Sequence, residues 1–214
     1  MTTRTEHVEI EGVRLLATLT TGGEVGLLAL HGSNEGGTAE LARSVSERCG
    51  ATSLVFTQPG VREPVHIPSP RMAVEHCALL RVFLSHVAVA VSLHGHRRRA
   101  TPRSIFLGGA NRRAAHLLAS GLSALRPEFD PVTDLAEIPA ALRGVHVRNP
   151  VNLPRRGGVQ VELPLSARTR RPGWDPEIPD TPPRPVVDAL VAGVRLLAAR
   201  SQADGAPQGT ALTD

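Results

Sequence analysis

The chain lacks lysine and tyrosine altogether, and its 214 residues include only two cysteines and 2% aromatic residues. So few aromatic side chains argue against a single-stranded nucleic-acid binder, because such proteins stack bases on aromatic rings. The two cysteines, Cys49 and Cys77, are too few for a disulfide framework, and we expect both to be reduced and packed. No apolar run reaches the length that crosses a bilayer, and residues 1–7 lack the apolar core of a signal peptide. We therefore expect a cytoplasmic protein with no membrane partner and no nucleic-acid partner.

All 24 basic residues are arginine, so the sequence pI is about 10.7 although the formal net charge is only +4. A guanidinium group binds a carboxylate or phosphate through two parallel hydrogen bonds, which suits an acidic partner. The hydrophobic content of 41% is that of an ordinary globular protein. We expect a monomer in which residues 1–202 form one domain and residues 203–214 form a disordered tail.

Alternating strand and helix patterns predict an α/β fold, a three-layer sandwich with a mostly parallel or mixed central sheet flanked by helices. The predicted strands cover residues 8–10, 15–19, 25–30, 53–56, 87–94, 105–107 and 159–163. The predicted helices cover residues 38–49, 71–85, 111–125 and 186–200, with one short helix within residues 129–143 and a proline-rich loop at 172–185. In such folds, ligands collect beyond the carboxyl ends of the strands.

Side chains that can bind a metal follow three of the predicted buried strands. His31 closes the first apolar run and is followed by Glu35, the second run ends in His94, and the third delivers Glu162. Two histidines and one glutamate make a catalytic zinc shell with an open position, and a further carboxylate can act as its base. The residues alone leave open which glutamate takes which role.

Several ordered segments between residues 28 and 168 resemble the zinc-dependent poly-gamma-glutamate hydrolases, whose fold is similar to that of metallocarboxypeptidases. These segments are His31-Gly32 with Glu35-Gly36-Gly37-Thr38 and Glu40, His66-Ile67 with Ser69, Ser92-Leu93-His94-Gly95, Leu107-Gly108-Gly109, Asn149-Pro150-Val151-Asn152, and Gly158 to Pro164 with Arg168. The resemblance implies a Zn²⁺ ion held by His31, Glu35 and His94, with Glu162 as the general base. It also implies four substrate-binding residues, His66, Asn152, Arg155 and Arg168.

One segment departs from the family pattern, because the loop between His31-Gly32 and Glu35 is one residue shorter here. Glu40 is the alternative ligand, although it lies inside a predicted helix. Arg168 has a structural alternative, in which it pairs with a helix end.

The arginines predict the kind of substrate. We expect three groups to meet at the edge of the sheet that carries the metal: Arg97-Arg98-Arg99, Arg112-Arg113 and Arg155-Arg156. A substrate with repeated carboxylates would meet a field of matching sign there.

Three functional hypotheses follow. The first is a zinc amidohydrolase that cleaves gamma-glutamyl amide bonds, with poly-gamma-glutamate as its substrate. The second keeps the zinc and changes the substrate to an N-acyl amino acid or a peptide terminus, as in aspartoacylase-like or carboxypeptidase-like enzymes. The third is a metal-free protein that binds an acidic polymer. If the substrate is an extracellular polymer, release by lysis of a phage-infected cell would bring the expected cytoplasmic protein to it.

Overall fold

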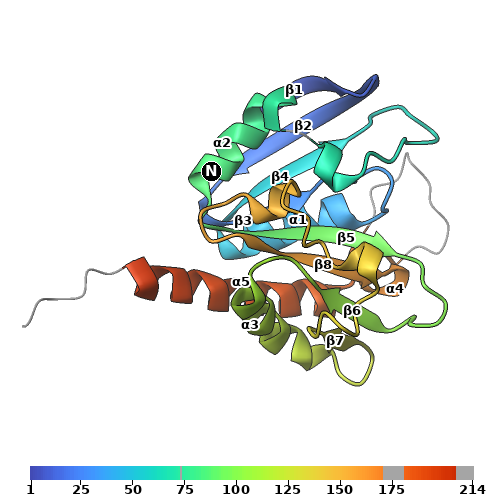
Figure 1. Cartoon of the computed structure of the whole chain (residues 1–214), viewed down its shortest axis with the longest axis vertical. Coiled ribbons are helices and arrows are strands. Elements are labelled where there is room, and N and C mark those ends of the chain that lie inside the picture. The colour runs from blue at the N-terminus through green and yellow to red at the C-terminus, as the bar shows by residue number, and fades with distance from the viewer. Residues whose placement is uncertain (73, 171–180, 206–214) are drawn as a thin grey trace, which may run out of the picture.

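Eight strands form one mixed sheet in the computed structural model, which describes residues 1–72, 74–170 and 181–205 (Figure 1). Across the sheet the strands run in the order β1-β2-β4-β3-β5-β8-β6-β7. Their bounds are Thr2–Ile10 for β1, Val13–Thr21 for β2, Gly23–Ala29 for β3, Ala51–Thr57 for β4, Val89–His96 for β5, Ser104–Leu107 for β6, Asp130–Val132 for β7 and Gly158–Pro164 for β8.

The centre of the sheet is parallel. β3 pairs in parallel with β4 and β5, and β5 pairs in parallel with β8. The pairs β1/β2, β2/β4 and β6/β8 are antiparallel. The carboxyl ends of β3, β5 and β8 therefore lie at one edge of the sheet, whereas β6 ends at the opposite edge.

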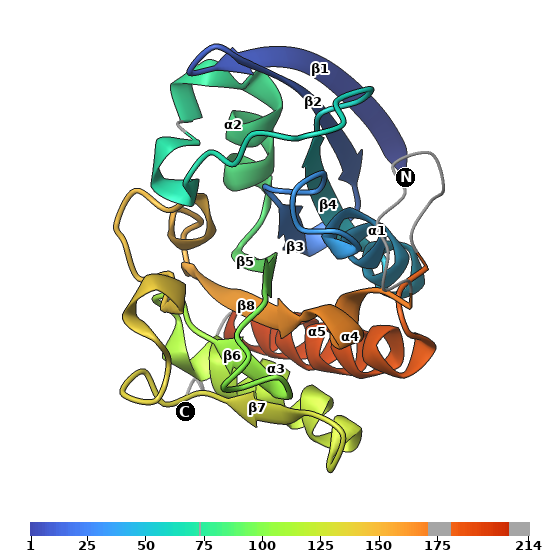
Figure 2. The ribbon, with the colours of Figure 1, turned by 90° about the vertical axis from the view of Figure 1, so that its right-hand side faces the viewer.

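Helices cover the two faces of the sheet unequally (Figure 2). One face packs against α1 (Thr38–Cys49), α3 (Arg112–Leu122) and α5 (Arg184–Gly205), and this layer forms the larger apolar core. On the other face, α2 (Ala78–His86) packs over β1, β2 and β4. Over β5 and β8 that face meets the turn at Pro150–Asn152, so loops cover the end of the sheet where the polar strand residues lie.

These layers confirm the predicted three-layer α/β sandwich, and most predicted elements have a counterpart. The predicted helix over residues 71–85 is shorter, because α2 begins only at Ala78 and two single 3₁₀ turns precede it. Glu6 of β1 sets this start, since its carboxylate accepts hydrogen bonds from the backbone N–H groups of Ala78 and Leu79. A contact between distant segments thus fixes a boundary that local sequence did not indicate.

The C-terminal boundary also differs from the prediction. α5 runs to Gly205, so residues 203–205 are helical where a disordered tail was expected. Residues 206–214 and most of the predicted proline-rich loop at 172–185 lie outside the described residues. Both cysteines are free thiols, as expected. Among the described helices, none combines the length and apolar character needed to cross a membrane.

Two glycines allow α3 and α5 to approach closely. A Cβ atom added to Gly121 in α3 would lie 2.4 Å from the backbone nitrogen of Gly193 in α5. This distance is well inside van der Waals contact, so any side chain at Gly121 must push the two helices apart.

Gly121→Ala should therefore destabilise the protein by about 1–3 kcal/mol, the usual cost of overpacking. In an exposed helix the same change would stabilise by about 1 kcal/mol, so the packing decides the sign. The midpoint of urea unfolding measures the effect, and the exposed neighbour Ser120→Ala serves as a control. A raised midpoint in Gly121→Ala would contradict the close helix contact.

Candidate metal centre

His31 lies just beyond the carboxyl end of β3, and its ring is fixed by a backbone carbonyl. Its Nε2 lies 2.7 Å from the carbonyl oxygen of Ile67. A carbonyl only accepts, so Nε2 carries the hydrogen, and Nδ1 of the neutral ring keeps its lone pair. A hydrogen bond of this kind sets which ring nitrogen is available to a metal.

Potential ligand atoms of Glu35 and His94 lie close to that lone pair. His31 Nδ1 lies 3.1 Å from Glu35 Oε1 and 3.1 Å from His94 Nδ1, and His94 Nδ1 lies 3.4 Å from Glu35 Oε2. In a tetrahedral zinc site with bonds of about 2.0 Å, neighbouring donor atoms lie about 3.3 Å apart. The donor set and its spacing therefore fit a zinc ion, and the shorter loop after His31 still brings Glu35 to both imidazoles.

Glu35 is held as a carboxylate. Only 13% of its side chain is exposed, and its Oε2 accepts a hydrogen bond of 3.0 Å from the backbone N–H of Gly95. Burial opposes ionisation, but the positive charge of His94 and the hydrogen bond from its ring outweigh it and hold the Glu35 pKa well below its usual range. The negative charge of Glu35 in turn raises the pKa of His94 against the effect of its burial.

Glu162 lies beside His94 in the parallel β5/β8 pair, where the two residues are register partners. Val159, Val161 and Leu163 belong to the core on the other face, as the predicted alternation requires. Burial, with a smaller contribution from the negative charge of Glu35, raises the pKa of Glu162 to about 7, although His94 works in the opposite direction. A carboxyl group with a pKa near neutrality can both accept and return a proton.

Two amides orient this carboxyl group, and the sequence did not reveal their role. Gln160 Nε2 donates to Glu162 Oε1 at 2.9 Å, and Asn149 Nδ2 donates to Gln160 Oε1 at 2.8 Å. On β5, Ser92 plays the corresponding part for His94, because Ser92 Oγ lies 2.8 Å from His94 Nε2. Gln160 and Ser92 each precede a functional residue by two positions, so strand periodicity was the signal that could have found them.

A cavity of about 510 Å³ opens over these groups. Its floor is the cluster of His31, Glu35, His94 and Glu162, and its walls are residues 66–70 and 140–149. His66 stands in one wall with its side chain 53% exposed, stacks on His31 at a ring-centre distance of 4.2 Å, and has Nε2 3.9 Å from Glu35 Oε1. His66 is thus placed either to contact a substrate or to provide another nitrogen near the metal.

Two of the other predicted substrate-binding residues bind the backbone. The amide group of Asn152 donates to the carbonyl oxygens of Gly144 and His146 and accepts from the N–H of Ala110, so it anchors a cavity wall. Arg168 is only 2% exposed and donates to the carbonyl oxygen of Gly36 just ahead of α1. This is the structural alternative for Arg168. Glu40, the alternative ligand, forms an ion pair with Arg43 on α1.

The predicted convergence of arginines at the metal edge is wrong for three of them. Arg155 pairs with Glu24 at the start of β3, and Arg156 N–H donates to Ala88 just before β5, so both lie at the opposite edge. Arg112 donates to the carbonyl oxygens of Leu107, Gly109 and Thr133. It lies at that same opposite edge, because β6 runs antiparallel to β8.

Solved structures similar to this chain show the fold to which it belongs. A bacteriophage poly-gamma-glutamate hydrolase has a TM-score of 0.69 and 22% identity, covering 91% of this chain and 93% of that one. The zinc-free apo form of YNDL has a TM-score of 0.65 and 22% identity, covering 91% and 89%. A putative carboxypeptidase from Burkholderia mallei has a TM-score of 0.50 and 10% identity, covering 94% and 64%. No curated protein matches the chain.

A family model described as poly-gamma-glutamate hydrolase matches residues 6–171. This range contains all four residues on the floor of the cavity, together with the parallel strands that carry them. The match spans most of the chain, and the chain belongs to the poly-gamma-glutamate hydrolase family.

Proposed function

We propose that the protein is a zinc-dependent amidohydrolase that cleaves gamma-glutamyl amide bonds and acts on poly-gamma-glutamate. The observation that carries the proposal is the convergence of His31 Nδ1, His94 Nδ1 and the Glu35 carboxylate within 3.1–3.4 Å of one another. A second buried carboxyl group, Glu162, lies next to them at the floor of an open cavity. Family membership supports hydrolysis, and the donor set supports zinc.

His31, Glu35 and His94 would hold the ion. When bound, zinc lowers the pKa of a water molecule toward about 7 and polarises the carbonyl of the scissile amide. Glu162 takes the proton from the attacking water as its oxygen bonds to the amide carbon, and then delivers that proton to the nitrogen as the C–N bond breaks. Gln160 holds the Glu162 carboxyl group in place through the hydrogen bond to Oε1.

One observation favours the second hypothesis, an N-acyl amino acid or a peptide terminus as the substrate. Among the residues that line this cavity in the described part of the chain, none is an arginine. An N-acyl amino acid or a peptide terminus brings at most one free carboxylate to the cavity, whereas a gamma-glutamyl polymer brings one for each unit, so a lining without arginine suits the smaller substrate. Comparing kcat/KM for poly-gamma-glutamate and for an N-acyl amino acid separates the two substrates, and the third, metal-free hypothesis is tested by metal content.

The folded protein should bind about one zinc ion per chain, and His31→Ala or His94→Ala should abolish binding, because two protein ligands are too few for a stable site. Elemental analysis of zinc-supplemented, dialysed protein measures this. His76→Ala, at an exposed position, is the control. His66→Ala should keep its zinc, and loss of zinc from His66→Ala but not from His94→Ala would move the site to His31, Glu35 and His66.

Glu162→Gln should retain zinc and fold while losing activity on poly-gamma-glutamate by about 10²- to 10⁴-fold, the usual contribution of a general base. Polymer chain length followed over time, together with bound zinc, provides both measurements. Glu40→Gln is the matched control and should stay active, since Glu40 pairs with Arg43 on α1. An active Glu162→Gln variant beside an inactive Glu40→Gln variant would show that the base is Glu40.

The raised pKa of Glu162 predicts how the stability of the metal-free protein changes with pH. Between about pH 4.5 and 7 the unfolded chain carries this group ionised while the folded protein keeps it protonated. The folded state then binds more protons, so this group lowers the free energy of unfolding as pH rises through that window.

Glu162→Gln removes this titration, so its unfolding free energy relative to wild type should rise from pH 4.5 to 7, by up to roughly 3 kcal/mol. Urea unfolding at several pH values in the presence of a chelator measures the difference. Bound zinc should flatten the slope, since a nearby cation favours the carboxylate. A constant difference across the window would contradict the raised pKa.

A further inference from the structure

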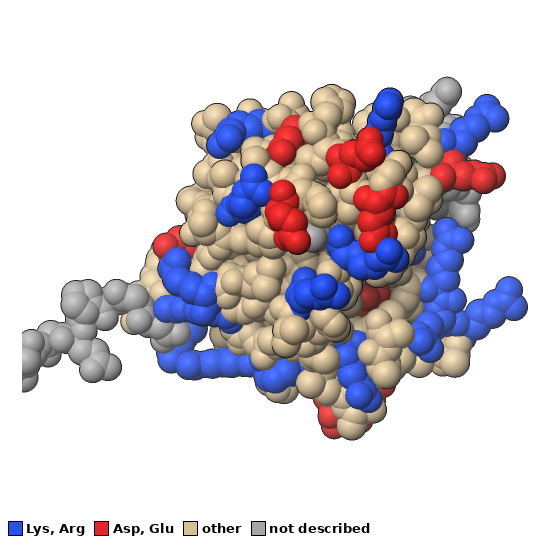
Figure 3. Space-filling view, turned by 45° about the horizontal axis from the view of Figure 1, so that its top comes forward, with Lys and Arg blue, Asp and Glu red and all other residues tan. Residues whose placement is uncertain are grey.

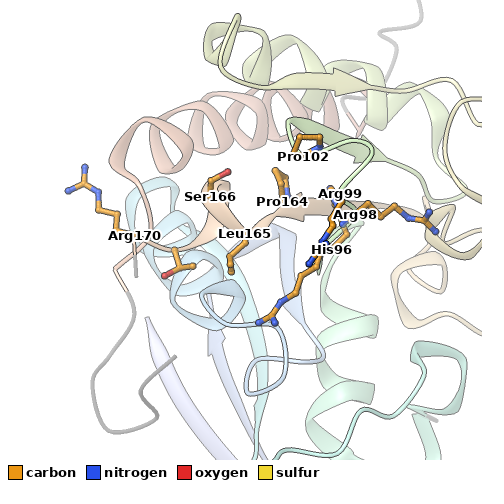
Figure 4. A pocket seen from close by; sticks show the side chains of 10 residues that line it. His96, Arg98, Arg99, Pro102, Pro164, Leu165, Ser166 and Arg170 are labelled. Carbon is orange, nitrogen blue, oxygen red and sulfur yellow. Dashed lines mark hydrogen bonds between the residues drawn. The ribbon is translucent and has the colours of Figure 1, made fainter. Parts of the chain in front are cut away.

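A second cavity, of about 530 Å³, lies at the same edge of the sheet as the metal site. We call it the arginine pocket. Its described lining consists of residues 96–99 at the end of β5, Pro102, residues 164–166 where β8 meets α4 (Leu165–Arg168), and residues 169–170. Figure 4 shows His96, Arg98 and Arg99 on one side of it and Pro164, Leu165 and Ser166 on the other. Within the part of the chain that the structure describes, it shares no lining residue with the cavity over the metal site.

Strand register places the arginine pocket directly after the catalytic pair. His94 is the partner of Glu162, and two positions further along the same strands His96 is the partner of Pro164. Residues two apart share a face of the sheet and lie about 7 Å apart. A polymeric substrate that extends along this edge from the scissile bond therefore reaches the arginine pocket about 7 Å further on, two residues along the strands.

The arginine pocket is strongly positive. Among the described residues that line it there are four arginines and no carboxylate. Arg97, Arg98 and Arg99 are exposed, and within the described residues they form no ion pair. Figure 4 shows arginine side chains fanning out around the end of β5, with Arg170 pointing away. In Figure 3 the acidic side chains lie mostly in the upper half of the face shown, and its lower half and right edge carry mainly arginine.

The side of the arginine pocket opposite His96 includes the apolar side chains of Pro164 and Leu165 beside the hydroxyl of Ser166, and Pro102 is also part of the lining. A gamma-linked glutamyl unit combines two backbone methylene groups with one free carboxylate, and its extended repeat is about 6 Å from ordinary bond lengths. The methylenes suit the apolar side and the carboxylate suits the arginine rim. An inorganic polyanion such as polyphosphate carries negative charge but offers no methylene groups.

We infer that the arginine pocket binds the glutamyl units next to the scissile bond, with Arg97, Arg98 and Arg99 pairing with their carboxylates. This inference rests on the proposed function and adds the part of the site that selects an anionic polymer. In this proposal cleavage takes place in the cavity over the metal site, whose described lining contains no arginine. The carboxylates of the substrate are recognised in the arginine pocket, two residues further along β5 and β8.

The test compares two triple variants that lower the formal charge equally, Arg97→Gln/Arg98→Gln/Arg99→Gln and the control Arg4→Gln/Arg14→Gln/Arg155→Gln. Arg4 and Arg14 lie on β1 and β2, and Arg155 lies at the opposite edge. Binding of labelled poly-gamma-glutamate to each triple variant in a zinc-loaded Glu162→Gln background is measured by fluorescence anisotropy. Kd should rise about tenfold or more for the pocket variant and less than about twofold for the control, with the difference shrinking at high salt.

In otherwise wild-type protein, the pocket variant should raise KM for the polymer while leaving kcat/KM for a neutral N-acyl substrate and bound zinc unchanged. An equal loss of affinity for the polymer in both triple variants, or no loss in either, would overturn the pocket assignment. Inorganic polyphosphate that competes as well as the glutamate polymer would also overturn it, because polyphosphate has no methylene groups. If the polymer binds through Arg97–Arg99 but wild-type protein does not cleave it, the proposed function fails and the pocket assignment stands.

Discussion

The parallel pairing of β3 with β5 and of β5 with β8 is the constraint on which the site depends. Parallel strands end at the same edge, so His31, His94 and Glu162 meet although they are separated by 63 and 68 positions in the chain. The pairing also fixes facing, since His94 and Glu162 are register partners and point to one side. Glu35 joins them from the loop after β3, held by the N–H of Gly95 at the end of β5.

The carboxyl groups of Glu35 and Glu162 differ in their surroundings, and the difference suits two roles. Glu35 lies beside His94, whose positive charge keeps the pKa of Glu35 well below its usual range, so that Glu35 is held as an anion. Glu162 is buried with one amide donor and feels the negative charge of Glu35, which raises its pKa to about 7. Neighbouring carboxyl groups with separated pKa values are typical of sites where one group binds and the other moves a proton.

The division of polar and apolar surface follows from the uneven covering of the sheet. α1, α3 and α5 cover one face over the central strands β3, β4, β5 and β8, so the residues of β5 and β8 on that face are apolar. On the other face α2 covers β1, β2 and β4, and loops cover the remainder. Those loops leave room for the cavity and for the amides of Gln160 and Asn149, which would be costly to bury without partners.

Local sequence determined most of the strands and helices and the polar residues at the strand ends, although it did not predict β7 or the start of α2. The apolar runs before His31 and His94 predicted buried parallel strands, and the alternation around Glu162 predicted which of its neighbours face the core, because both patterns depend on the backbone period alone. Only the tertiary structure decided which strands pair, in which direction they run, and therefore at which edge of the sheet their ends lie. The antiparallel direction of β6 and the position of residues 155–156 before β8 moved these arginines to the far edge, and a contact from Glu6 set the start of α2. Strand direction and long-range hydrogen bonds join segments far apart in the chain, so no local pattern records them.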